Sequence, residues 1–194
     1  MVAGEFHMAN LSSKALIRVD IQNDFLANSS VAIARAQEII PNVNELSCNS
    51  FFKLVVDIRD CHKPTHNSFA KWGQHCIEGS YGYNPPSTLY VNSNIKLFHK
   101  GMDDKVDTLS GFENPELLPY LLAQKIQSIY IVGLALDFCV LSTAIDAVKY
   151  NFATYIILDA CKGINVNMDN LTFQKKLASQ GIKTLKTADI LSLK

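Results

Sequence analysis

The sequence lacks the features that would assign the protein to a membrane, to nucleic acid or to a disulfide-rich scaffold. No apolar run approaches the length of about eighteen residues that a transmembrane helix needs, and the N-terminus has no signal-peptide hydrophobic region. The 18 basic and 18 acidic residues cancel, so we expect neither a nucleic-acid nor a membrane partner. The five cysteines are odd in number and include no C-x-x-C pair. This usage favours a reducing, cytoplasmic setting.

The chain has 194 residues, enough for one domain with a substantial core. Residues 1–14 are interpreted as a cloning remnant, MVAGEFH, followed by an N-terminal extension, and residues 15–194 as a single domain. Apolar β-branched runs predict strands at 15–21, 53–58, 95–100, 128–135 and 154–160. Helical patterns cover 31–48, kinked or divided at Pro41, and then 115–125, 137–150 and 170–181. The alternation predicts an α/β fold, a three-layer sandwich whose mainly parallel central sheet has helices on both faces.

Three reactive side chains fall at the ends of different predicted strands. Asp20 is near the end of the first strand, Lys100 ends the third, and Cys139 follows the fourth, in the first turn of a helix that Asp137 is expected to cap. A thiol at the positive end of a helix dipole loses its proton more easily, and the thiolate is the nucleophile. Taken singly, these residues could be a loop-capping acid, a surface lysine and a core cysteine. A parallel sheet gathers its strand ends at one edge, so their joint placement favours a base, a cation and a nucleophile.

The stretch 61–94 has no clear period and is rich in His and aromatic residues, which is typical of a functional loop. Asp60 and His62 are two residues apart, so in an extended segment their side chains point the same way, as two ligands of one metal would. His75 is within reach if the loop folds back, and His66 is an extra ligand or a neighbour of one. Each His alone could be an ordinary polar loop residue. One carboxylate and two imidazoles would leave positions open for water or substrate, with zinc expected and iron or manganese as alternatives.

The chain closely resembles the nicotinamidases of the isochorismatase-like cysteine hydrolase family, over nearly its whole length from residue 15 to about residue 163. The resemblance is carried by five segments in the family's order, VDIQNDF, RDCHKPTHNSF, WGQHC, HKG and GLALDFCVLSTAIDA. It implies a catalytic triad of Asp20, Lys100 and Cys139, and a metal held by Asp60, His62 and His75. Departures from the family's usual residues stand at Cys61, Gly73 and Leu136.

The resemblance implies hydrolysis of the amide nicotinamide to nicotinic acid and ammonia through a thioester, as a step of NAD salvage in the cytoplasm, with one divalent transition metal per chain. It also implies a cis peptide bond between Leu134 and Ala135. The N–H groups of Ala135 and Cys139 would then form an oxyanion hole. Phe25 and Trp72 would close on the faces of the substrate ring, unless they are core residues. The subunit number is left open, a homo-oligomer included.

Three other functions fit parts of the pattern. Within the family, the alternative is hydrolysis of isochorismate or of a different small amide, although the complete Asp-x-His plus His set favours the pyridine amide. A carboxylate with two His also suits a non-haem iron oxygenase, but that class has no use for a strand-end Lys and a helix-start Cys. A non-catalytic interaction protein on the same fold would be expected to have lost at least one reacting group, and all are present.

Overall fold

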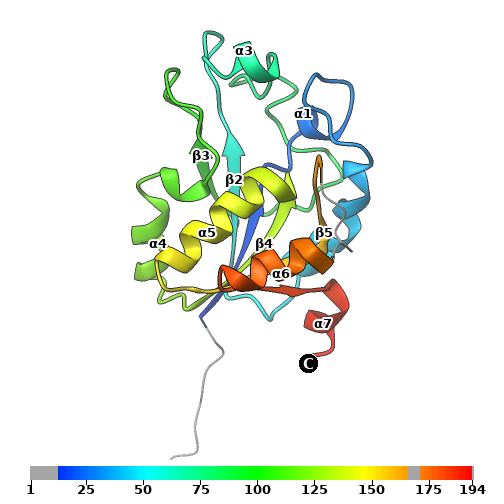
Figure 1. Cartoon of the computed structure of the whole chain (residues 1–194), viewed down its shortest axis with the longest axis vertical. Coiled ribbons are helices and arrows are strands. Elements are labelled where there is room, and N and C mark those ends of the chain that lie inside the picture. Colours follow the sequence, from blue (N-terminus) through cyan, green and yellow to red (C-terminus); the bar gives the residue numbers. More distant parts are fainter. Residues whose placement is uncertain (1–12, 166–170, 194) are drawn as a thin grey trace, which may run out of the picture.

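A six-stranded parallel sheet lies between two layers of helices in the computed structural model, which describes residues 13–165 and 171–193 (Figure 1). The strands are β1 (Lys14–Val19), β2 (Leu54–Asp60), β3 (Lys96–Lys100), β4 (Ser128–Leu134), β5 (Ala153–Lys162) and β6 (Ile182–Leu185). Their order is β3-β2-β1-β4-β5-β6, and every neighbouring pair is parallel. The predicted three-layer α/β fold is confirmed. The strand order reverses between β1 and β4, and ligands of open α/β sheets bind at the carboxyl ends beside such a reversal.

Helices cover both faces of the sheet. They are α1 (Asn23–Leu26), η1 (Ala36–Ile39), α2 (Ile40–Ser47), α3 (Phe69–Trp72), η2 (Gly111–Glu113), α4 (Leu117–Ala123), η3 (Leu136–Val140), α5 (Leu141–Lys149), α6 (Leu171–Ser179) and α7 (Thr187–Leu191). Figure 1 shows α5 and α6 crossing the near face. Helix α4 contributes to the same core, whereas α2 and α7 pack in the core of the opposite face. No helix of the described segments is long and apolar enough to cross a membrane.

Alternate residues of β1 pack into the two hydrophobic cores, one on each face of the sheet. Ala15 and Ile17 pack in the core that contains Ala144 and Ala147 of α5, whereas Leu16 packs in the core beneath α2. This alternation follows from the two-residue period of a strand. Burial on both faces explains why the central strands are mainly apolar.

Several elements differ from the prediction. Residues 31–35 are not helical, and Pro41 lies in the first turn of α2, where its missing N–H interrupts no hydrogen bond. β6 and α7 have four and five residues, too few to show a period. Gly181 follows α6 with a φ of +80°, which fits the predicted glycine after that helix. The interpretation of residues 1–12 and the predicted helical residue 170 lie outside the described residues.

Gly133 allows β4 to approach β1 at the reversal of strand order. A Cβ atom at this position would lie 2.1 Å from the carbonyl oxygen of Val19, and the φ of +119° also favours glycine. The close approach places the ends of the two strands side by side. These ends lead directly to Asp20 and to the turn that carries Cys139.

Candidate active site

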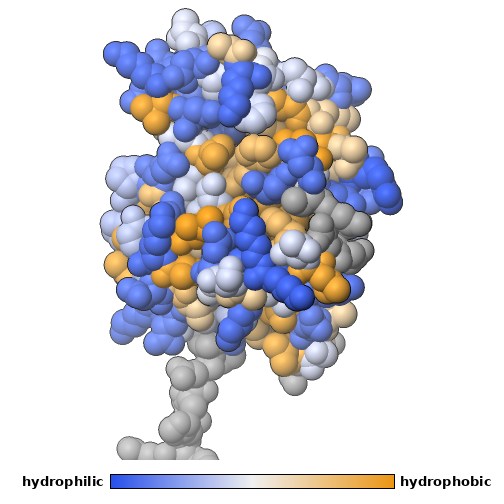
Figure 2. Space-filling view, in the orientation of Figure 1, coloured by the Kyte–Doolittle hydropathy of each residue, from blue (hydrophilic) through white to orange (hydrophobic). Residues whose placement is uncertain are grey.

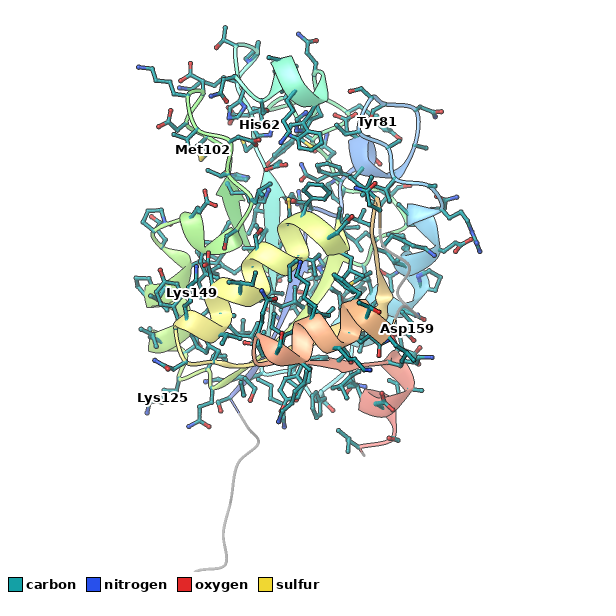
Figure 3. The ribbon with its side chains drawn as sticks, viewed as in Figure 1. His62, Tyr81, Met102, Lys125, Lys149 and Asp159 are labelled. Atoms are coloured by element: carbon teal, nitrogen blue, oxygen red, sulfur yellow. The ribbon has the colours of Figure 1, made fainter. Side chains whose placement is uncertain are left out.

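The carboxyl ends of β1, β3 and β4 bring the three predicted reactive side chains together. The Nζ atom of Lys100 lies 2.9 Å from Oδ2 of Asp20 and 3.5 Å from Sγ of Cys139. All three residues are buried, with Asp20 at 0% exposure. Figure 3 shows His62 at this end of the sheet and Lys125 at the opposite end of the molecule. A carboxylate, an ammonium and a thiol therefore share one buried cluster.

Asp20 is positioned by the backbone where the chain leaves β1. Its φ is +51°, and its N–H still donates to the carbonyl of Ile58 at 2.9 Å. Within residues 13–165 and 171–193, neither carboxylate oxygen accepts an aligned hydrogen bond. Burial raises the pKa of Asp20 to about 7, against the opposing effect of the Lys100 charge. A carboxyl group with a pKa near neutrality can both take and return a proton.

Cys139 lies in the π-helical turn η3, directly before α5. The prediction that Asp137 caps this helix is wrong, because its carboxylate instead accepts the backbone N–H groups of Ile164 and Asn165, at 2.9 and 2.8 Å. The expectation that the Cys139 thiol loses its proton easily is wrong too. Burial raises the pKa of Cys139 well above its ordinary value, although Lys100 opposes this effect. The resting thiol is therefore protonated, and its activation requires a base.

Asp60, His62 and His75 form a compact group of metal-ligating side chains, whose ligand atoms all lie within 4.8 Å of one another. Nδ1 of His62 lies 2.9 Å from the carbonyl oxygen of Gly101, and Nδ1 of His75 lies 2.8 Å from that of Gly73. These contacts orient both rings and leave the two Nε2 atoms for a cation. Among the described residues, Nε2 of His62 is buried without a hydrogen-bond partner. The donor set and this buried orphan atom fit a divalent metal.

Asp60 connects the metal-ligating group to the buried cluster of Asp20, Lys100 and Cys139. Its Oδ1 lies 2.5 Å from Nζ of Lys100, and its Oδ2 lies 3.6 Å from Nε2 of His62. Burial alone would raise the pKa of Asp60, but Lys100 and His62 hold it well below its usual range. Asp60 is therefore ionised at neutral pH, the state that a metal ligand needs.

Gly101 allows the backbone after β3 to pass close to the His62 ring. Its φ is +70°, and a Cβ atom there would lie 2.4 Å from Cε1 of His62. Only glycine has the space and the backbone freedom for this approach. The sequence signal for it is the HKG segment, in which the glycine directly follows Lys100.

A cavity of about 220 Å³ opens beside Cys139. Phe25 and Trp72, the predicted ring-binding residues, both line it, together with His75 and Phe138. Trp72 packs edge-on against Phe138, with ring centroids 5.7 Å apart. Figure 2 shows hydrophobic residues gathered between the loops at the top of the molecule and the helices below them. The cavity therefore has mainly apolar walls beside a polar end, which suits a small aromatic amide.

Several residues that line the cavity were not predicted from the sequence. Phe138 could have been found from its place directly before Cys139, the predicted nucleophile. Asp107 carries no motif, but its Oδ2 accepts a hydrogen bond from Nε1 of Trp72 at 3.2 Å. The loop that carries Asp107 lines the cavity together with Ile164, which follows β5. Only the folded chain brings these segments beside Trp72.

The fold and the site have counterparts among known proteins. The model of the isochorismatase domain matches residues 14–189. This chain belongs to the isochorismatase family. It is 31% identical to the nicotinamidase of Acinetobacter baylyi over 213 residues, covering 96% of this chain and 99% of that protein. It is 29% identical to the nicotinamidase of Escherichia coli, covering 79% of this chain and 84% of that protein.

A solved structure of the pyrazinamidase of Pyrococcus horikoshii in complex with zinc is similar throughout. The TM-score is 0.82 at 31% sequence identity, covering 90% of this chain and 99% of that chain. The isochorismatase-family fold is thus shared over nearly the whole length. The zinc bound in that structure and the Asp60, His62 and His75 group of this chain both indicate a divalent metal.

The turn before Cys139 has the feature that the resemblance to this isochorismatase family implies. The peptide bond between Leu134 and Ala135 is cis, although no proline is present. Ala135 and Cys139 both line the cavity. Their N–H groups are therefore the predicted donors for an oxyanion formed at the cavity wall.

His66 lies beside the metal-ligating group of this isochorismatase-family chain. Its ring centroid is 4.1 Å from that of His62, and its Nδ1 lies 2.7 Å from Oγ of Ser68. The compact ligand group comprises Asp60, His62 and His75. The geometry thus makes His66 a neighbour of the His62 ring.

The residues that depart from the family's usual pattern are accommodated locally. Cys61 is buried, and its N–H continues the pairing of β2 by donating to the carbonyl of Lys100. Gly73 has a φ of +80°, and a Cβ atom there would lie 2.5 Å from Oγ of Ser30. Leu136 is fully buried in the core. None of these residues displaces a reacting group.

Proposed function

We propose that the protein is a metal-dependent nicotinamidase, a cysteine hydrolase that converts nicotinamide to nicotinic acid and ammonia. The observation that carries this proposal is the meeting of the Cys139 thiol, the Lys100 ammonium and the Asp60 ligand group at one small, mainly apolar cavity. The two curated nicotinamidases at 31% and 29% identity support the choice of substrate. The free cysteines support a reducing setting, and the cytoplasm is the location we propose.

Acylation begins with transfer of the Cys139 thiol proton to Asp20. Lys100, with Nζ 3.5 Å from the sulfur, stabilises the thiolate by its charge. The thiolate attacks the carboxamide carbon, and the oxyanion of the tetrahedral intermediate accepts hydrogen bonds from the N–H groups of Ala135 and Cys139. Asp20 then returns its proton to the departing ammonia. A thioester between the nicotinoyl group and Cys139 remains.

Deacylation uses the same base. Asp20 removes a proton from a water molecule that attacks the thioester carbonyl, and it then returns this proton to the departing Cys139 sulfur. Nicotinic acid leaves, and the thiol is restored. Phe25 and Trp72 hold the ring between them, which keeps the carbonyl aligned with the sulfur.

The metal that we propose is zinc, held by Asp60, His62 and His75. When bound, it supplies a Lewis-acidic partner for the nitrogen of the pyridine ring. Nδ1 of each His is engaged by a backbone carbonyl, so each ring would offer its Nε2 atom. The zinc in the Pyrococcus horikoshii pyrazinamidase structure supports this choice of metal.

Ammonia release from nicotinamide, measured beside a panel of other small amides and beside hydrolysis of isochorismate, tests the proposal. We expect the largest kcat/KM for nicotinamide. Cys139→Ala should lose turnover of every substrate and keep its circular dichroism spectrum, because the nucleophile is lost and one buried sulfur is removed. Faster turnover of isochorismate or of another amide would instead assign the alternative activity within the family.

A further inference from the structure

Strand β1 leaves the sheet before β2 ends, and this opens a gap beside Asp60. The register pairs Val19 with Ile58, after which β2 continues for two more residues. The last main-chain hydrogen bond on this side runs from the N–H of Asp20 to the carbonyl of Ile58. Both backbone groups of a strand residue point to the same neighbouring strand. The N–H and the carbonyl of Asp60 therefore face a position that β1 has vacated.

The side chain of Gln22 fills this gap. Its Oε1 accepts the N–H of Asp60 at 2.9 Å, and its Nε2 donates to the carbonyl of Asp60 at 2.8 Å. Nε2 also donates to the carbonyl of Tyr83 at 3.0 Å, and Gln22 is 0% exposed. A carboxamide has the donor and the acceptor of a peptide group, so it can replace the missing strand residue. The chain leaves β1 at Asp20, which directs the Asp20 carboxylate into the site. Gln22, two residues later, supplies the backbone hydrogen bonds that Asp60 would otherwise lack.

We propose that Gln22 is a positioning residue that fixes Asp60 for its two tasks. One task is the ion pair with Lys100, in which the two atoms are 2.5 Å apart, and the other is metal binding beside His62. Gln22 binds the backbone N–H and carbonyl of Asp60 on the side away from β3. These two hydrogen bonds restrain the backbone of Asp60 and therefore the direction of its carboxylate. The third hydrogen bond ties the same carboxamide to Tyr83, in the loop that follows His75. This inference rests on the proposed function, in which Asp60 is a metal ligand.

A positioning role and a general stabilising role differ in what they change. A buried carboxamide that only stabilised the fold would alter the unfolding temperature and leave metal affinity unchanged. Residues that orient metal ligands typically contribute about 10-fold to 100-fold in metal affinity. Zinc affinity is therefore the decisive readout.

The experiment compares Gln22→Leu and Gln22→Glu with wild type and with Asn44→Leu. Gln22→Leu removes both hydrogen-bonding functions, and Gln22→Glu keeps the size and the acceptors but loses the donor. Asn44 is the matched control, since its carboxamide also clamps backbone, donating to Thr88 and accepting from Tyr90 at 2.8 and 2.7 Å, outside the cavity lining. Zinc affinity is measured by competition with a chromogenic chelator, and folding by circular dichroism.

We expect both Gln22 variants to bind zinc about 10-fold to 100-fold more weakly than wild type. Asn44→Leu should bind zinc as wild type does, and excess zinc should restore part of the nicotinamide turnover of Gln22→Leu. If Gln22→Leu does not fold, the zinc affinity of the nearly isosteric Gln22→Glu decides. Wild-type zinc affinity in the folded Gln22 variants would overturn the positioning role and leave the proposed function standing. Absence of zinc binding by wild type would overturn the proposed metal site, and this inference with it.

Discussion

At the scale of single residues, the candidate site is a cluster of buried charges that set one another's protonation. Burial alone would lower the pKa of Lys100, but Asp20 and Asp60 raise it well above its usual value. The ammonium is therefore fixed in its charged form. Asp20 is the one carboxyl of the cluster whose pKa is raised toward neutrality, to about 7, because burial outweighs the effect of Lys100. This division keeps Asp60 ionised and supports Asp20 as the proton-exchanging group of the proposed mechanism.

The pH dependence of turnover should follow from the pKa of Asp20. The base must be ionised, and its pKa is raised, so activity should be lost as pH falls through about 7. We expect kcat/KM for nicotinamide to rise between about pH 5 and pH 8 and then to level off. Asp20→Asn should lose turnover at every pH in this range. A wild-type profile that is flat across the range would show that Asp20 is not the base.

Lys100→Met should move the reactivity of Cys139 to higher pH. The charge of Lys100 lowers the pKa of the thiol against the larger effect of burial, so its removal raises that pKa further. The measurement is the rate of alkylation by iodoacetamide as a function of pH. Lys149→Met, which removes an exposed lysine of α5, is the control and should match wild type. An unchanged profile in Lys100→Met would remove this lysine from thiolate stabilisation.

At the scale of elements, the close contact of β1 and β4 positions the triad, and Gly133→Ala should disrupt it. A Cβ at Gly133 would lie 2.1 Å from backbone, whereas a Cβ at Gly79, which also has a positive φ, would meet nothing within 4 Å. In urea unfolding we expect Gly79→Ala to cost about 1 kcal/mol from backbone conformation alone. Gly133→Ala should cost at least about 3 kcal/mol, because the strands must also separate. Equal losses would mean that the approach of β1 and β4 is not tightly constrained.

The sequence was sufficient to predict the strands that are buried on both faces and the reactive side chains at strand ends. β1 and β4 are mainly apolar because helices cover both faces, and this made them recognisable. Asp20, Lys100 and Cys139 could be grouped because a parallel sheet gathers its strand ends at one edge. The short strand β6 could not be predicted, since four residues carry no clear period.

Interactions between distant loops could not be read from the sequence. Asp137 has the residue type of a helix cap, yet its carboxylate binds the backbone after β5, which is adjacent only in the folded chain. Burial of the Cys139 thiol is likewise a tertiary property, and it raises the pKa of the thiol, whereas the local sequence indicates a lowered pKa. The carboxamide of Gln22 belongs to the same class, because the gap that it fills exists only after β1 and β2 have paired.

At the scale of the whole molecule, the end of β2 and the loop after α3 should be joined through one metal. Asp60, His62 and His75 should hold about one zinc ion per chain in freshly prepared protein, measured by elemental analysis. His62→Ala should contain almost none. Chelation should lower the Tm of wild type, because a ligand that binds the folded state stabilises it, and should leave the Tm of His62→Ala unchanged. Zinc retained in His62→Ala would place the metal elsewhere.

We propose that a single cavity binds the pyridine ring at its metal-ligating end and presents the amide to Cys139. The most direct test is the ratio of kcat/KM for nicotinamide to that for benzamide, which has the same carboxamide and a carbon in place of the ring nitrogen. A site built around a specific polar contact rejects an analogue that lacks it by several orders of magnitude. We predict a ratio of at least about a thousand. Comparable values for the two amides would show that Asp60, His62 and His75 have no part in recognising the ring.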